Sequence, residues 1–106
     1  MESWTPDQLK QHLDKGDKVF LKLWKQGCGV CKLSQSATDR MEKDNRFNLV
    51  FGRISVADHP EMLDLAGTDS LPTFFVFSEK KKRGQYTGFK GQAKLEEFVK
   101  DSLEEE

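Results

Sequence analysis

The sequence predicts an α/β fold: a mixed β-sheet of about four to five strands flanked by helices on both faces. Three observations support this prediction. The chain has 106 residues with eight Phe and two Trp, enough to bury a core in a single domain spanning 1–106. Short apolar runs alternate with segments of helical periodicity along the chain. A turn of hairpin length separates the last two predicted strands, which are therefore antiparallel.

The N-terminal half predicts a helix, a strand and a second helix. Residues 5–8, Thr-Pro-Asp-Gln, form a capping box with proline in the first turn. The helix carries Leu9 and Leu13 on one face and ends at Gly16. The apolar run from Val19 to Trp24 is short and bulky, which favours a buried strand.

The next helix is predicted to run from Cys28 to about Asn45, because apolar residues recur every four positions. A strand is predicted over 48–56, a short helix after residue 59, a strand over 73–77, a charged turn over 79–84, a strand over 85–89 and a helix over 92–103. The three Phe residues of the 73–77 strand belong to the core.

Charge and hydropathy exclude several classes of function. A third of the residues are charged, yet the net charge is −1, so nucleic-acid binding is not expected. The basic residues at 80–83 are interpreted as a solvated turn, and the acidic tail at 104–106 as a solvated end. No run is long enough to span a membrane, and the first residues lack a signal pattern. We expect a cytoplasmic protein, unless a signal peptide has been removed.

The only two cysteines, Cys28 and Cys31, lie two residues apart where a strand meets a helix. They are too few for a disulfide framework or a closed zinc site, and His12 and His59 are not at finger-like spacing from them. At a helix N-terminus, unpaired N–H groups and the helix dipole favour a thiolate. The spacing also allows a disulfide, so this arrangement indicates redox chemistry.

With these features the chain resembles the thioredoxin family over nearly its whole length. Trp24 lies four residues before Cys28, and Pro72 lies in Leu-Pro-Thr before a strand, where the family has a cis-proline. Gly88 and the helix over 92–103 match the end of the family pattern.

The resemblance implies that Cys28 attacks disulfides of protein substrates and that Cys31 resolves the mixed disulfide. It implies that a substrate peptide pairs with the backbone at Leu71, beside Pro72, with Gly88 on the opposite wall. A separate reductant recycles the pair, no organic cofactor or metal is needed, and a monomer is expected. An oxidase or isomerase, and a binding module whose cysteines are incidental or hold a cluster between subunits, remain alternatives.

The sequence departs from the family motif W-C-G-P-C, although Gly29 is retained. Gly27 replaces the tryptophan and Val30 the proline, which predicts an untypical redox potential. Lys22 stands where thioredoxins usually have a buried acid. Two interpretations of Lys22 remain: it lowers the pKa of Cys31, or it extends to water or to a carboxylate such as Asp58.

Three further residues receive structural interpretations. Trp24 either orients the active-site loop or is a core aromatic, and the two roles are compatible. Arg53 is expected on a solvated face, and His59 is expected to cap a helix or lie at the surface.

Overall fold

A computed structural model describes residues 1–104 of the chain. Glu105 and Glu106, the end of the predicted solvated tail, lie outside the described residues. The elements are β1 (Glu2–Ser3), α1 (Pro6–Asp14), β2 (Val19–Trp24), α2 (Gly29–Asp44), β3 (Val50–Ser55), α3 (Met62–Ala66), β4 (Thr73–Ser78), β5 (Lys81–Thr87) and α4 (Gln92–Leu103). Within residues 1–104, no helix is long and apolar enough to cross a membrane.

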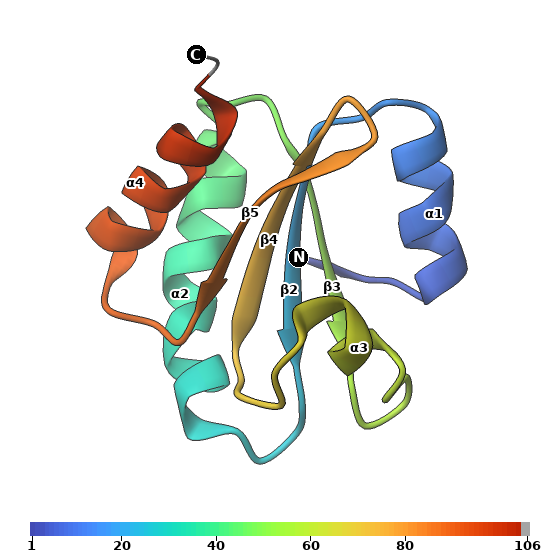
Figure 1. Cartoon of the computed structure of the whole chain (residues 1–106). Coiled ribbons are helices and arrows are strands. Elements are labelled where there is room, and N and C mark those ends of the chain that lie inside the picture. The colour runs from blue at the N-terminus through green and yellow to red at the C-terminus, as the bar shows by residue number, and fades with distance from the viewer. Residues whose placement is uncertain (105–106) are drawn as a thin grey trace.

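The strands form one mixed sheet in the order β1-β3-β2-β4-β5. β3 pairs in parallel with β1 and β2, whereas β4 is antiparallel to both β2 and β5. Helices α2 and α4 cover one face of the sheet, and α1 and α3 lie on the other (Figure 1). The predicted layering is therefore confirmed, and β2 lies at the centre of the sheet with its C-terminal end leading to α2.

Each face of the sheet has its own apolar core, because successive side chains of a strand point to opposite faces. Phe75 and Phe77 pack with Leu21 and Trp4 in the cluster on the side of α1 and α3. Phe74 and Phe20 pack with residues of α2 and α4 on the other side. The three Phe residues of β4 are all buried, as the sequence predicts.

The helix ends follow the predicted signals. Thr5 and Gln8 form the reciprocal capping box of α1. Asn45 ends α2 and Gly67 ends α3, both in the left-handed region with φ of 44° and 67°.

β1 is not predicted from the sequence, because it has only two residues and therefore shows no alternation of apolar and polar side chains. The strand places the following Trp4 over Gly52 of β3, where any β-carbon at Gly52 would collide with the indole ring. Gly52 is thus required by a close approach between neighbouring segments.

The predicted turn over 79–84 and strand over 85–89 are wrong in their boundaries. Only Glu79 and Lys80 form the turn, with φ of 55° and 67°, so Lys81 to Gly84 belong to β5. Two residues with positive φ match the twist of a two-residue hairpin. Such turns usually contain Asn or Gly, and neither residue type occurs at these two positions. β5 ends at Thr87, and Gly88 follows it with φ of 88°.

Candidate active site

The two cysteines lie at the start of α2, in the first turn after the loop that leaves β2. Cys28 is the N-cap of α2, and its sulfur accepts a hydrogen bond from the Cys31 N–H at 3.1 Å. Gly27, directly before it, has φ of 86°, a conformation that suits glycine far better than the tryptophan of the common motif. The backbone thus explains one of the departures from that motif.

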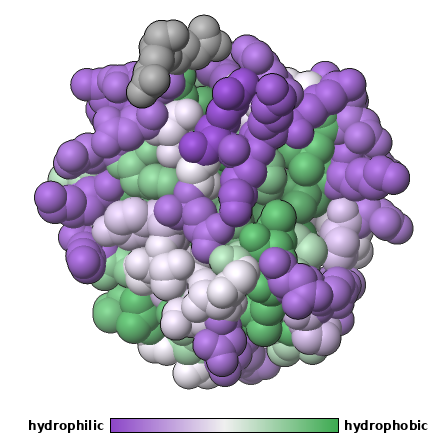
Figure 2. Space-filling view, viewed as in Figure 1, coloured by the Kyte–Doolittle hydropathy of each residue, from purple (hydrophilic) through white to green (hydrophobic). Residues whose placement is uncertain are grey.

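Cys28 and Cys31 form a disulfide, with their α-carbons 5.2 Å apart. Cys31 is only 3% exposed, whereas Cys28 is half-buried. The sulfur of Cys28 is therefore the more accessible of the two. Close by, Val30 and Leu33 of α2 are 41% and 71% exposed, and Figure 2 shows hydrophobic surface at the end of the molecule where α2 begins.

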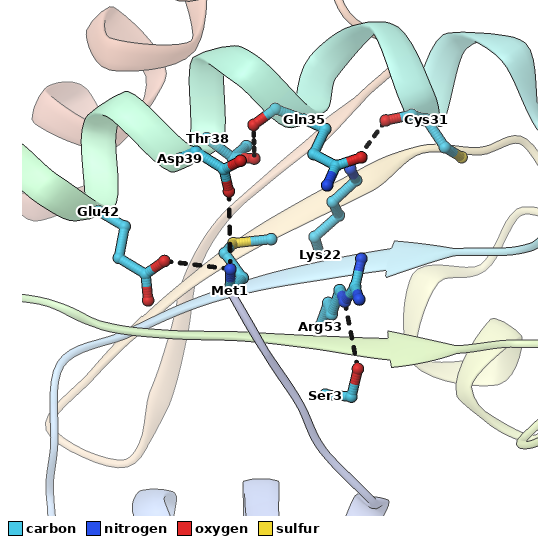
Figure 3. A network of polar contacts seen from close by, with 9 residues as sticks. All are labelled: Met1, Ser3, Lys22, Cys31, Gln35, Thr38, Asp39, Glu42 and Arg53. Atoms are coloured by element: carbon cyan, nitrogen blue, oxygen red, sulfur yellow. Dashed lines mark hydrogen bonds and ion pairs between the residues drawn. The ribbon is translucent and has the colours of Figure 1, made fainter.

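Lys22 lies under α2 and is only 3% exposed, so it does not extend into water. Its Nζ donates a hydrogen bond to the carbonyl oxygen of Cys31 at 2.8 Å. Figure 3 shows the amine directed at this carbonyl, with the Cys31 sulfur pointing away from it. No ion pair joins Lys22 to Asp58 among the described residues.

The pKa of Lys22 is lowered to about 8, chiefly because burial disfavours the charged amine. The positive charge of Arg53 contributes to this lowering of the pKa, and the negative charge of Asp39 opposes it. Asp39 is itself in an ion pair, with the N-terminal amine of Met1 at 3.6 Å.

The expectation that Arg53 lies on a solvated face is only partly correct, because its side chain is partly exposed but lies beside Lys22. Arg53 pairs in register with Lys22 on the neighbouring strand, so both side chains project from the face that α2 covers. The guanidinium is half-buried, lies 4.8 Å from the ring centre of Trp24 and donates to the Ser3 hydroxyl. Parallel register between two distant strands is not readable from the sequence alone.

Trp24 ends β2 and is partly buried beneath this guanidinium. Its Nε1 is buried and has no hydrogen-bond partner among the described residues. The ring therefore contributes mainly its apolar faces to the site.

The structure brings Pro72 and Gly88 into direct contact. The Leu71–Pro72 peptide bond is cis, and the Gly88 N–H donates to the Pro72 carbonyl at 2.8 Å. Pro72 is buried and Leu71 is half-buried.

A pocket of 430 Å³ opens beside the disulfide and is lined by Lys22, Trp24, Cys28, Gly29 and Cys31. Its lining also includes Lys25, Lys32, Gln35 and Arg53, for which the sequence predicts no role in the site. Leu71, Pro72, Gly88 and Val30 are not part of its lining. Within residues 1–104, no group of three or more His, Cys, Asp or Glu side chains is arranged to hold a metal ion.

Comparisons with known proteins agree with this geometry. A family model described as Thioredoxin matches residues 1–101. A thioredoxin from Coprinus comatus is 26% identical over 92% of this chain and 92% of its own length. A thioredoxin from Alicyclobacillus acidocaldarius is 24% identical over 89% and 90%, respectively.

Solved structures support the same fold. Mitochondrial thioredoxin 3 from Saccharomyces cerevisiae, in its oxidized form, superposes with a TM-score of 0.83 at 20% identity, over 95% of this chain and 94% of its own. Thioredoxin NaTrxh from Nicotiana alata gives 0.82 at 18% identity, over 97% and 92%. The family match, the fold and the cysteine pair together support a thiol–disulfide oxidoreductase.

Proposed function

Because this chain belongs to the thioredoxin family, we propose that it reduces disulfides of protein substrates through a dithiol–disulfide cycle of Cys28 and Cys31. The observation that carries the proposal is the Cys28–Cys31 disulfide at the N-terminus of α2, with the more accessible sulfur on Cys28. Unpaired N–H groups and the positive helix end stabilise a thiolate there.

In the reduced protein, the Cys28 thiolate attacks one sulfur of the substrate disulfide. A Cys28–substrate disulfide forms, and the other substrate sulfur leaves as a thiolate that takes up a proton. The Cys31 thiolate then attacks the Cys28 sulfur and releases the second substrate thiol. Two electrons pass to the substrate, and the protein ends with the Cys28–Cys31 disulfide present in this structure.

The backbone at Leu71, beside cis-Pro72, is the proposed pairing site for the substrate chain, with Gly88 forming the opposite wall. The exposed apolar side chain of Val30 offers contact surface next to Cys28. Trp24 and Gly29 support the loop and the first turn of α2 that hold the cysteines.

Lys22 is proposed to favour the thiolate of Cys31. Its amine lies against the Cys31 carbonyl, so a positive charge there lowers the thiol pKa through space. Replacing Lys22 with Met should raise the pKa of the Cys31 thiol in the reduced protein, followed by NMR of labelled cysteine. An unchanged value would leave Lys22 with a structural role only.

The proposed cycle needs a separate reductant to regenerate the dithiol. Reduction suits a reducing compartment such as the cytoplasm, where we place the protein as a monomer. The reduction potential of the Cys28–Cys31 pair tests whether the protein reduces or oxidises its substrates. A value of about −270 mV fits a reductase, whereas one of about −120 mV would indicate an oxidase.

Substrate trapping tests the mechanism directly. Cys31→Ser should accumulate mixed disulfides at Cys28 when incubated with a cell extract, because the resolving thiol is missing. Cys28→Ser is the matched control and should trap far less, since Cys31 is buried. Equal trapping by both variants, or by neither, would contradict the assigned roles.

A further inference from the structure

The pocket beside the disulfide is strongly cationic. Lys22, Lys25, Lys32 and Arg53 line it, and none of its lining residues is acidic. This is a local property, because the chain as a whole carries a net charge of −1. A concave site with charge of one sign concentrates ligands of the opposite sign.

Lys22 and Arg53 form the inner part of this lining, side by side on paired strands. Among the described residues, neither takes part in an ion pair with a carboxylate. The nearby carboxylate of Asp39 lies against the Met1 amine, in a second, smaller cavity of 180 Å³ that Lys22 and Arg53 also line. Two cations thus lie side by side in the lining of the pocket; burial first and the charge of Arg53 second lower the pKa of Lys22, while Asp39 offsets part of this shift.

We propose that this pocket binds a carboxylate of low-molecular-weight disulfides and so makes small anionic disulfides preferred substrates of Cys28. The inference rests on the proposed thiol–disulfide exchange and adds a substrate class to it. The volume of 430 Å³ falls within the range of small-molecule sites. The pocket is also distinct from Leu71 and Pro72, which do not line it and are proposed to pair with protein chains.

The chemistry balances without another reagent when the protein starts reduced. The Cys28 thiolate attacks R–S–S–R, forming Cys28–S–S–R and one RSH after protonation. Cys31 then displaces the second RSH and closes the Cys28–Cys31 disulfide. A carboxylate on R lies near Arg53 and Lys22 during the first step, which orients the scissile bond at the pocket wall formed by Cys28.

Three small disulfides of similar size test the preference: dithiodipropionate (anionic), bis(hydroxyethyl) disulfide (neutral) and cystamine (cationic). For each disulfide, the second-order rate constant for oxidation of the reduced protein is measured. This constant is divided by the rate constant for reduction of the same disulfide by dithiothreitol, which removes differences in leaving-group reactivity. At low salt, the normalised rate should be about tenfold higher for the anionic than for the neutral disulfide, and lowest for cystamine.

Variants locate the preference in the pocket. Arg53→Gln should reduce the rate with the anionic disulfide, relative to the rate with the neutral disulfide, at least threefold. Lys25→Gln with Lys32→Gln, both exposed, should do the same if Arg53→Gln proves unstable. Lys81→Gln, on the edge strand β5, is the matched control and should change nothing. Suberate, which has two carboxylates but no disulfide, should inhibit competitively.

The outcomes separate this inference from the proposed function. If none of the three disulfides oxidises the protein, thiol–disulfide exchange itself is contradicted. If all three react with equal normalised rates, or if Lys81→Gln alters the preference as much as Arg53→Gln, exchange stands and the anion pocket is overturned.

Discussion

Lys22 is the residue whose environment is least favourable for its own charge. Its side chain is buried, and a second cation lies beside it on the paired strand. One N–H is satisfied by the Cys31 carbonyl, but that carbonyl also accepts a hydrogen bond from the Ser34 hydroxyl at 2.8 Å. The carbonyl therefore does not depend on Lys22, and the lysine is retained at an energetic cost.

Lys22 should make the stability of the oxidised protein rise with pH. Its pKa is about 8 in the folded protein, against the ordinary lysine value of 10.5 in the unfolded chain, so between these values the unfolded chain binds more protons. The contribution of Lys22 to the free energy of unfolding therefore increases from pH 8 to 10.5. Below pH 8 the amine is charged in both states, and the folded state is then destabilised by the full cost of burying that charge. In Lys22→Met this increase should vanish, and the variant should be about 2 kcal/mol more stable at pH 7.

Urea unfolding at pH 7 and pH 9.5 measures this difference. The groups that face the Lys22 amine and change its pKa are Arg53 from β3 and Asp39 from α2. If the free energy of unfolding had the same pH dependence in the parent and in Lys22→Met, the pKa of the Lys22 amine would not be lowered in the folded protein. The oxidised form is used because its disulfide cysteines do not titrate.

The β4–β5 hairpin is the element in which local conformation and residue type disagree most clearly. Lys80 is exposed and has φ of 67°, which lies in the left-handed region. This backbone conformation is unfavourable in free energy for a residue with a β-carbon. Lys80→Gly should therefore stabilise the protein by about 0.5–1 kcal/mol, measured by thermal or urea unfolding. Lys81→Gly, one residue later in β5, should have the opposite effect, because glycine weakens a strand. Loss of stability in both variants would contradict this account.

This disagreement also explains which elements the sequence could predict. The start of α1, the end of α2 and the junction before Cys28 are set by local signals, and all were found. The Glu79–Lys80 turn lacks those signals, so its position was wrong. β1 was missed because two residues show no periodicity.

The candidate site divides in the same way. The cysteine pair and Pro72 were found because their spacing follows a known pattern. The position of Arg53 beside Lys22 depends on the register between β2 and β3, which only the folded sheet defines. The cationic pocket is built from that register, so it could not be predicted from the sequence.

At the scale of the whole molecule, net charge and local charge make opposite predictions for an anionic substrate. The protein carries a net charge of −1, dithiodipropionate carries two negative charges, and the attacking thiolate is also negative. If the total charge governed encounter, added salt would screen repulsion and accelerate the reaction. If the pocket governs it, added salt screens attraction to Arg53 and its neighbours and slows the reaction.

We expect the pocket to dominate, because the Debye length of about 10 Å at 0.1 M salt leaves nearby charges effective while distant ones are screened. Raising the ionic strength from about 0.01 to 0.3 M should lower the rate with dithiodipropionate several-fold in stopped-flow measurements. The rate with bis(hydroxyethyl) disulfide should stay constant, and Arg53→Gln should flatten the salt dependence for the anion. A rate that rises with salt in the parent protein would mean that the four cations of the pocket do not guide the substrate.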